Sequence, residues 1–305
     1  MDTNNKLPPG FDNPVASPED EVAQKNWQHR NRDWWENNPM RYDWNSRLKA
    51  EEFSEEFYRE IDWRHFEDAR CYCPWLNKPF DRFIPYENLG NMDVLEIGVG
   101  NGSHAQLLAS SSKSYTGIDL TSYAVKSTAK RLKLFGIQGN IIQMDAEKLE
   151  FPDNSFDFIW TWGVIHHSSN SACVLKEIHR VLRHGGCAIT MVYHRSFFYY
   201  YIFNGIFRGL LSGQFLKQPN LHKLVQMNTD GAIARFYSID EWRNLVSNNF
   251  EIDEIVIMGQ KSELLPLPNS KLKSWIMSII PDKAARFILG YMHQGSFLLT
   301  KLRKI

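Results

Sequence analysis

Apolar and polar residues follow two different rhythms along the middle of the chain. Segments in which apolar residues recur every three or four positions predict helices at 103–111, 121–136 and 168–186. Between them lie short, almost wholly apolar runs that are typical of buried parallel strands. These predicted strands are 92–100, 114–120, 140–146, 156–165 and 187–194. Because strands alternate with helices, the pattern predicts a parallel sheet covered by helices on both faces.

Local signals set the expected ends of the helices. Thr121 is an expected N-cap, because its hydroxyl can accept a hydrogen bond from the first turn. Gly136 is an expected stop, as is the pair Gly185-Gly186 after the third helix. Ser238 and Glu241 have the spacing of a capping box, which predicts a further helix after residue 238.

The segment 197–216 is strongly apolar except for one stripe. Its polar residues Asn204, Arg208 and Ser212 are four positions apart, so they share one face of a helix. An arginine at the centre and three glycines argue against a membrane span. Two interpretations stay open: a lid over a site, or a helix that gives peripheral membrane contact.

The chain is expected to have five parts. Residues 1–24 are rich in proline and acidic residues, which predicts a poorly ordered lead-in. Residues 25–90 are rich in tryptophan and charge, and Phe53, Phe57, Ile61 and Phe66 lie near one helical face. The expected parts are the lead-in 1–24, a helical cap 25–90, a core 91–195, a lid or substrate insertion 196–237, and a C-terminal part 238–305 that completes the core and holds an inserted helix.

Composition narrows the class of protein. The chain has 305 residues, 43% of them hydrophobic and 23% charged, as in an ordinary globular protein. Its 35 basic and 35 acidic residues cancel, which argues against a nucleic-acid partner. The balance is uneven, with 18 acidic and 12 basic residues in 1–90, and 8 acidic and 14 basic residues in 191–305.

Cysteine usage and the N-terminus point to a reducing compartment. Four cysteines do not make a disulfide framework, and their spacing lacks the pairs of a zinc site, so no metal is expected. The first residues are polar and acidic and have no apolar stretch typical of a signal peptide. A cytoplasmic location is therefore expected, with peripheral membrane contact as the open alternative.

The candidate chemistry lies at the ends of the predicted strands. After the first strand comes Glu96 and then Gly98, Gly100 and Gly102 in a GxGxG pattern. Glycines there let the backbone approach a ligand closely. A dinucleotide fingerprint needs its third glycine one residue later, so a nicotinamide cofactor is disfavoured.

Two further acidic residues end strands at the same edge of the sheet. Asp119 ends the second strand, where a carboxylate can accept both hydroxyls of a ribose. Asp145 and Ala146 end the third strand, where an adenine edge can be read. Together with Glu96, these positions predict an adenosine site that also suits an amino group and a positive charge.

At this point the sequence resembles the class I S-adenosylmethionine-dependent methyltransferases, in a small-molecule subgroup similar to methyltransferase type 11. The matching segments are VLEIGVGNG, GIDL, MDAEKLEFPDNSFDFIWTWGVIHH and EIHRVLRHGG, although His184 stands where the family usually has proline. The resemblance implies a Rossmann-like, doubly wound α/β fold with a seven-stranded sheet whose last strand is antiparallel. It also implies S-adenosyl-L-methionine as cofactor and S-adenosyl-L-homocysteine as product.

The resemblance also assigns cofactor contacts. Glu96, Gly98, Gly100 and Gly102 would line the methionine part, and the backbone of Trp162, Gly163 and Val164 would lie beside it. Asp119 and Leu120 would hold the ribose and adenine, and Asp145 and Ala146 the adenine.

An oxygen acceptor usually needs a base to remove its proton during methyl transfer. His166 and His167 end the fourth predicted strand, and Tyr193 and His194 end the fifth, so these four are the candidate bases. Each can instead only shape the pocket.

The acceptor is expected to be a small molecule, sugar or lipid. Aromatic residues in both flanks, Trp34, Trp35, Tyr42 and Trp44 and the run 197–201, can stack on it or can form a second small core. Asp230, Arg235 and Tyr237 can place polar groups over the pocket or can form a turn. An N- or C-methyltransferase and a non-catalytic cofactor-binding protein stay open as alternatives, and the oligomeric state is undetermined.

Overall fold

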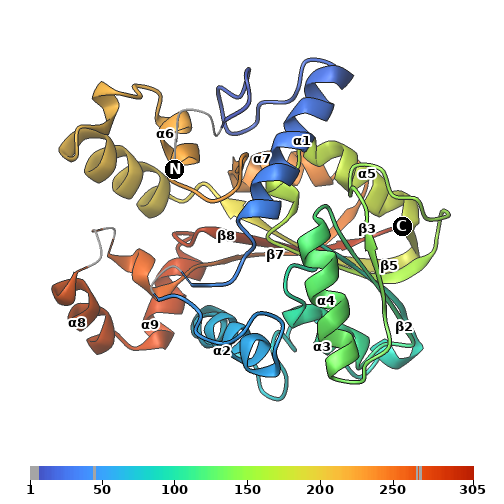
Figure 1. Ribbon diagram of the computed structural model, residues 1–305. Helices are drawn as coiled ribbons and strands as arrows, with labels where there is room; N and C mark the ends of the chain where they lie inside the picture. The colour runs from blue at the N-terminus through green and yellow to red at the C-terminus, as the bar shows by residue number, and fades with distance from the viewer. Residues whose placement is uncertain (1–6, 44–45, 266, 268–269) are drawn as a thin grey trace.

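The computed structural model describes residues 7–43, 46–265, 267 and 270–305. Its centre is one twisted sheet with the strand order β3-β2-β1-β4-β5-β8-β7. Helices cover both faces of the sheet (Figure 1). The strands are β1 (Asp93–Ile97), β2 (Ser114–Asp119), β3 (Asn140–Gln143), β4 (Phe156–Trp162), β5 (Leu182–His194), β6 (Phe236–Tyr237), β7 (Glu251–Met258) and β8 (Phe297–Arg303).

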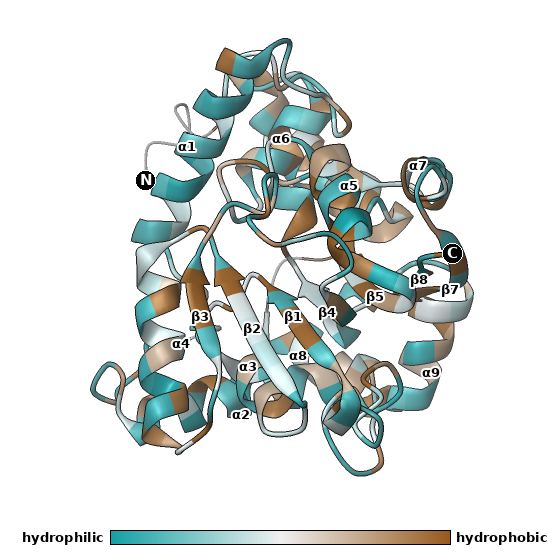
Figure 2. Ribbon diagram, turned by 90° about the vertical axis from the view of Figure 1, so that its right-hand side faces the viewer, coloured by the Kyte–Doolittle hydropathy of each residue, from teal (hydrophilic) through white to brown (hydrophobic). Residues whose placement is uncertain are grey.

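The parallel half of the sheet confirms the predicted architecture. Strands β1 to β5 pair in parallel, whereas β8 runs antiparallel to both β5 and β7. Figure 2 shows β3, β2, β1 and β4 side by side with their carboxyl ends pointing toward α1 (Glu21–Asn37). Residues that follow these strands therefore gather at one edge of the sheet.

The expected number of seven strands is wrong, because the sheet formed by the described residues has eight. Strand β5 continues past the end of β4, whose last partner in β5 is Met191. The backbone of Tyr193 and His194 then pairs in parallel with Phe236 and Tyr237 of β6. A two-residue strand has no periodic pattern, so the sequence did not signal it.

Two apolar cores form the layers. On one face, α5 (Ser171–Val181) and α7 (Ile239–Val246) pack their buried side chains against the sheet. On the other face, α2 (Glu55–Tyr72), α3 (Ser103–Ala109) and α4 (Ser122–Leu134) do the same. Successive residues of β1 alternate between the cores, since Val94 faces one and Leu95 the other.

The boundary between α5 and β5 differs from the prediction. The helix ends at Val181, and β5 begins at Leu182 rather than after the glycine pair. Phe156 of β4 pairs with Leu182 but Phe158 pairs with Cys187, so β5 bulges in between. Gly185 has φ 75°, and its amide donates to the Lys304 carbonyl. The glycines thus form a bulge near the start of β5, beside the last residues of the chain, instead of a helix stop.

The described N-terminal residues pack against the insertion and lead into helix α1. Phe11 is buried against Trp27 and Ile233, and α1 begins at Glu21, inside the stretch 1–24 that the sequence suggested as a lead-in. Asp20 caps α1 by accepting from the amide of Ala23. The predicted caps Thr121 and Ser238 also accept helix amides, and the capping box of Ser238 and Glu241 is complete.

Two insertions lie beside the sheet. The first holds the π-helical segment η4 (Phe197–Leu211), the short turn η5 (Gln214–Leu216) and α6 (Leu221–Met227). The second holds η6 (Lys261–Leu264), α8 (Lys271–Ile279), α9 (Asp282–Arg286) and η7 (Phe287–Tyr291). Single turns η2 (Leu89–Asn91) and η3 (Ile165–His167) precede β1 and follow β4.

Among the described residues, no helix is both long enough and apolar enough to cross a bilayer. Segment η4 instead forms one wall of a cavity.

Candidate functional site

One large cavity lies at the carboxyl edge of the parallel strands, and its volume is about 1330 Å³. It holds both the predicted cofactor positions and the inner side of the first insertion. Predicted cofactor residues on its wall are Glu96, Gly98, Gly100, Asp119, Leu120, Ala146, Trp162, Gly163 and Val164. Gly102 and Asp145 do not line it.

The glycine turn after β1 fits a ligand at one position in particular. A side chain at Gly100 would meet nothing within 4 Å, so the backbone there faces open space. At Gly98 a Cβ would come within 2.2 Å of Val164, which explains this glycine by packing. Both residues have positive φ, a conformation that glycine adopts without strain.

Gly102 has a structural role instead of a ligand contact. It begins α3 with φ 80°, and a Cβ there would approach Arg131 and Thr128 to about 3 Å. The GxGxG pattern therefore combines one open position with two positions required by packing.

Asp119 is oriented toward the glycine turn. Its Oδ2 accepts a hydrogen bond from the Gly100 amide (3.1 Å), and its Oδ1 accepts from the Thr121 amide (2.9 Å) and hydroxyl (2.8 Å). Burial raises the pKa of this carboxyl, and the amides of Thr121 and Gly100 oppose that rise. The side chain is thus fixed where a ribose was predicted.

Glu96 is buried at the centre of the site. Its Oε2 accepts a hydrogen bond from the Tyr115 hydroxyl at 2.5 Å. Burial raises its pKa to about 8, although the Tyr115 hydroxyl favours the ionised form. This carboxyl is therefore mainly protonated at neutral pH, and a cationic ligand beside it would favour ionisation.

The N-terminal part supplies contacts that sequence reasoning missed. Gln28 of α1 donates to Asp145 Oδ1 (2.8 Å), which places α1 over this strand end. Glu36 accepts from the amides of Ser122 (2.8 Å) and Tyr123 (3.1 Å) at the start of α4. Gln28 and Glu36 are two of many polar residues on α1, so the sequence does not show that these two make contacts at the site.

The segment after α1 closes the same side. The Asn101 amide donates to the Met40 carbonyl (2.6 Å), so residues 38–43 lie against the glycine turn. Trp34, Trp35 and Tyr42 line the cavity, as expected. Trp44, which was grouped with them, lies outside the described residues.

The four candidate bases separate into two groups. His167 and Tyr193 line the cavity, whereas His166 and His194 do not. His166 is fully buried, its ring nitrogens have no hydrogen-bond partner, and burial lowers its pKa well below the usual value. His194 is held through Nδ1 at 2.7 Å from the Gly295 carbonyl.

His167 has a defined orientation. Its Nδ1 lies 2.6 Å from the Ile233 carbonyl, and because a carbonyl only accepts, Nδ1 carries the proton. Nε2 is then the basic nitrogen. The ring also packs edge-on against Trp35 at 4.9 Å.

Tyr193 is hydrogen-bonded to an acidic residue, Asp230. Its hydroxyl donates to Asp230 Oδ1 (2.9 Å), and both residues line the cavity. Burial and Asp230 raise the pKa of Tyr193 well above its usual value, so the phenol stays protonated. Of the pair, the carboxylate is the group able to accept a proton.

Segment η4 separates its aromatic residues into two sets. Tyr199, Phe203 and Phe207 line the cavity together with the predicted stripe residues Arg208 and Ser212. Tyr200 is buried outside the cavity and packs on Phe236, so part of the run forms the small second core that the sequence allowed. Asn204 is buried and donates to the Tyr199 carbonyl.

Arg235 and Tyr237, grouped with Asp230 in the sequence, have structural roles. The buried Arg235 guanidinium donates to the carbonyls of Ser168, Ser169 and Ala16. The Tyr237 hydroxyl donates to Ser171 Oγ at 2.8 Å. These contacts hold the 230–237 segment against η3, which carries His167.

The cavity ends at the second insertion. Glu263 accepts from Ser296 and from the Gln260 amide, and burial raises its pKa to about 7. Lys273 lines this end and lies 6.0 Å from the Phe203 ring. Among the described residues, no group of three His, Cys, Asp or Glu side chains is arranged to hold a metal ion.

The fold and the strand-end residues define an α/β domain built for an adenosine-containing ligand. Residues 95–190 match the family model described as "Methyltransferase domain". This core is therefore a class I S-adenosylmethionine-dependent methyltransferase domain, as the sequence motifs predicted.

Two relatives share this part of the chain. The phthiotriol/phenolphthiotriol dimycocerosates methyltransferase of Mycobacterium tuberculosis is 38% identical over 137 residues, which are 41% of this chain and 50% of that protein. The fatty-acid O-methyltransferase of Mycolicibacterium smegmatis is 37% identical over 95 residues, 30% of this chain and 34% of that protein. The matches thus span half or less of these relatives.

A solved structure extends the likeness of fold. The [4+2]-cyclase SpnF aligns with 96% of this chain and 98% of its own, with a TM-score of 0.51 and 16% identity. The likeness concerns the fold alone, since proteins of one fold perform different reactions.

Proposed function

We propose that the protein transfers a methyl group from S-adenosylmethionine to an oxygen of a lipid-like acceptor. The observation that carries this proposal is the single cavity that joins Gly100 and Asp119 to Tyr199, Phe203 and Phe207 of η4. A cofactor at the glycine turn and an acceptor against the aromatic wall would share one enclosed space.

The strand-end residues suit the cofactor. Open space at Gly100 admits a ligand against the backbone, and the fixed carboxylate of Asp119 suits ribose hydroxyls. Glu96 would face the cationic methionine part. When bound, S-adenosylmethionine supplies an electrophilic methyl group on a positively charged sulfur.

The aromatic wall suits an apolar acceptor. Tyr199, Phe203 and Phe207 present rings, while Arg208 and Asp230 add a few polar groups, as is common in ligand sites. Two relatives whose names specify a dimycocerosate and a fatty acid favour a lipid-like molecule over a sugar.

The residues of the chain would align the acceptor, exclude water and accept its proton. His167 is the proposed base, since its protonated Nδ1 is held by the Ile233 carbonyl and Nε2 is left basic. Asp230, oriented by the Tyr193 hydroxyl, is the second candidate. A positioned base contributes about 10²–10⁴-fold to the rate.

The first test is calorimetric titration with S-adenosylmethionine and S-adenosylhomocysteine, followed by transfer of labelled methyl to fatty acids, long-chain alcohols and sugars. We expect binding of both cofactor forms and transfer to a long-chain oxygen acceptor. Binding without transfer to any oxygen, nitrogen or carbon acceptor would favour a non-catalytic protein. Absence of binding would overturn the proposal.

The second test compares His167→Gln with Asp230→Asn at saturating cofactor. With an alcohol acceptor, we expect His167→Gln to lower kcat by about 10²-fold or more while cofactor affinity stays unchanged. His166→Gln is the matched control for the neighbouring ring, which lies outside the cavity wall. A larger loss in Asp230→Asn would assign the base to the carboxylate.

A further inference from the structure

Exposed apolar side chains gather in two stretches of the described chain. Of the eighteen large hydrophobic side chains that are exposed there, twelve lie in 197–216 and 272–292. These two stretches make up only about a seventh of the sequence. The twelve are Phe197, Tyr201, Ile206, Leu210, Leu211, Leu216, Leu272, Trp275, Ile279, Phe287, Tyr291 and Met292.

The exposure is high at the tips of both stretches. Leu211 and Leu216 are 71% and 92% exposed, and Trp275 and Tyr291 are 62% and 78% exposed. Scattered surface hydrophobics are ordinary, but such a concentration marks an interaction surface.

Both stretches lie on the same side of the molecule. Figure 1 shows the gold helical segment beside α6 and the red helices α8 and α9 on one side of the sheet. They also meet, because the Lys273 ammonium lies 6.0 Å from the centroid of the Phe203 ring. Phe203 and Lys273 both line the cavity, so the cavity reaches between the two stretches.

The charge around these stretches is mainly positive. Segments 197–229 and 264–292 together carry seven Lys or Arg residues and one acidic residue, Asp282. Of the seven, Lys273 is buried and Lys223 is paired with Asp12 at 2.6 Å. Asp282 is itself paired with Lys261 at 2.8 Å. The whole chain is neutral, so this side is basic against a balanced background. A basic surface with exposed Leu, Trp and Tyr side chains complements an anionic lipid surface.

We propose that the exposed faces of η4–η5 and of α8–η7 form one surface that docks on anionic membranes. The apolar tips would enter the headgroup region, and the exposed lysines Lys217, Lys271 and Lys283 would contact lipid phosphates. A lipid acceptor would then reach the cavity from the bilayer between η4 and α8. This last step rests on the proposed function, whereas docking does not.

The test is co-sedimentation of the full chain with vesicles, in the absence of cofactor and acceptor. We expect binding to vesicles of phosphatidylcholine and phosphatidylglycerol in equal parts, and weaker binding to pure phosphatidylcholine. The double variant Leu211→Ser/Trp275→Ser should bind the anionic vesicles about tenfold more weakly. The matched control is Trp63→Ser/Leu76→Ser, whose residues are also exposed but lie outside both stretches.

Three results would overturn the docking surface: no binding to anionic vesicles, equal loss in both double variants, or a dimer in sedimentation velocity that the Leu211→Ser/Trp275→Ser change dissociates. Turnover of a detergent-dispersed acceptor separates this proposal from the proposed function. If docking is right, the double variant keeps that turnover and loses only turnover of acceptor in vesicles. If the methyl-transfer proposal fails, the vesicle binding still stands.

Discussion

At the scale of one residue, the protonation of Glu96 affects both the stability of the fold and the binding of a cationic ligand. Glu96 is 2% exposed and accepts a hydrogen bond from the Tyr115 hydroxyl, and burial raises its pKa to about 8. In the unfolded chain the same carboxyl ionises near its ordinary value of 4.5. Because the folded pKa is the higher one, this group's contribution to stability is complete below pH 4.5 and is lost as the pH rises toward 8.

We predict that binding of the cationic cofactor releases a proton from Glu96. Between pH 6 and 8 the affinity for S-adenosylmethionine should rise by up to about tenfold per pH unit, because only the ionised carboxyl pairs with the cation. Titration calorimetry in buffers of different ionisation enthalpy measures the proton released. Glu96→Gln should bind more weakly at pH 8 and show neither effect, and an unchanged pH slope in that variant would assign the proton elsewhere.

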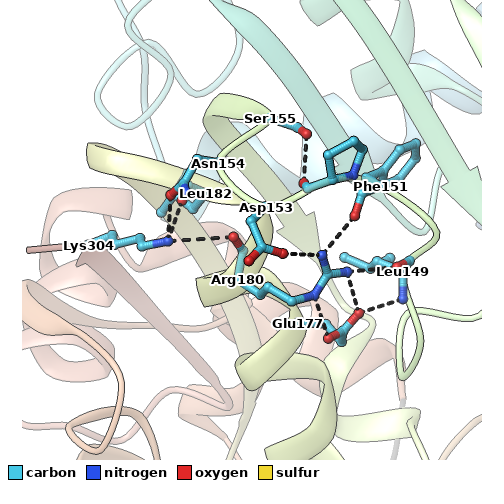
Figure 3. Close-up of polar contacts among 10 residues, drawn as sticks. Leu149, Phe151, Asp153, Asn154, Ser155, Glu177, Arg180, Leu182 and Lys304 are labelled. Carbon is cyan, nitrogen blue, oxygen red and sulfur yellow. Dashed lines mark hydrogen bonds and ion pairs between the residues drawn. The ribbon is translucent and has the colours of Figure 1, made fainter.

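At the scale of elements, one arginine joins the end of α5 to the loop before β4. Arg180 donates to the carbonyls of Leu149 and Phe151 (both 2.7 Å) and to the carboxylates of Asp153 and Glu177 (both 2.8 Å), as Figure 3 shows. The hydrogen bond from Arg180 holds the pKa of Glu177 below its usual value. The network thus fixes the start of β4 far from the cavity.

We predict that Arg180→Ala lowers the free energy of unfolding by about 2 kcal/mol, because it removes the donor that two carbonyls and two carboxylates share. Partial exposure to solvent keeps the loss near this value. The matched control is Arg243→Ala, since Arg243 pairs with the exposed Asp240 and should change stability by less than about 0.5 kcal/mol. Urea unfolding of the unchanged protein and the two variants measures these differences. Equal midpoints would contradict the stabilising role of Arg180.

The same elements explain which boundaries the sequence predicted. Apolar runs and glycines marked β1, β2 and β4 and the turn at Gly98, because each signal is local. The boundary between α5 and β5 depends on the hydrogen bond from the Gly185 amide to the Lys304 carbonyl. Lys304 is more than a hundred positions away, so no local sequence pattern predicts this contact. A helical cap was predicted over 25–90, but the position of α1 over the site was not, because it depends on single polar contacts such as Gln28 to Asp145.

At the scale of the whole molecule, the family motifs predicted one edge of the site, and the packing of the flanks determined the other. Strands β1 to β5 follow from the apolar pattern. The pairing of Tyr193 with Asp230, and the choice of His167 over His166 for the cavity wall, depend on how 230–237 folds back on η3. Because 230–237 and η3 are far apart in the sequence, the sequence alone does not reveal that arrangement.

A chain of buried neutral rings also runs through the molecule and sets its response to acid. Trp160 donates to His104 Nδ1 (2.9 Å), so His104 carries its proton on Nε2, which lies 3.2 Å from His65 Nε2. Protonating either histidine would place two donors against each other. Burial accordingly lowers the pKa of His65 to about 3 and that of His104 well below its usual value.

We predict that the protein loses stability as the pH falls from 7 to 5, because the unfolded chain gains protons on histidines that the folded chain keeps neutral. For each such histidine the loss approaches about 1.4 kcal/mol per pH unit below pH 6.5. The raised pKa values of Glu96 and Glu263 act in the opposite direction, since both carboxyls are already protonated in the folded chain over most of that range.

Urea unfolding at several pH values measures the net slope of stability against pH. His65→Gln, which keeps an acceptor for His104, should make the slope shallower by about one proton. A slope that is the same in both proteins would show that the buried rings do not control the acid response.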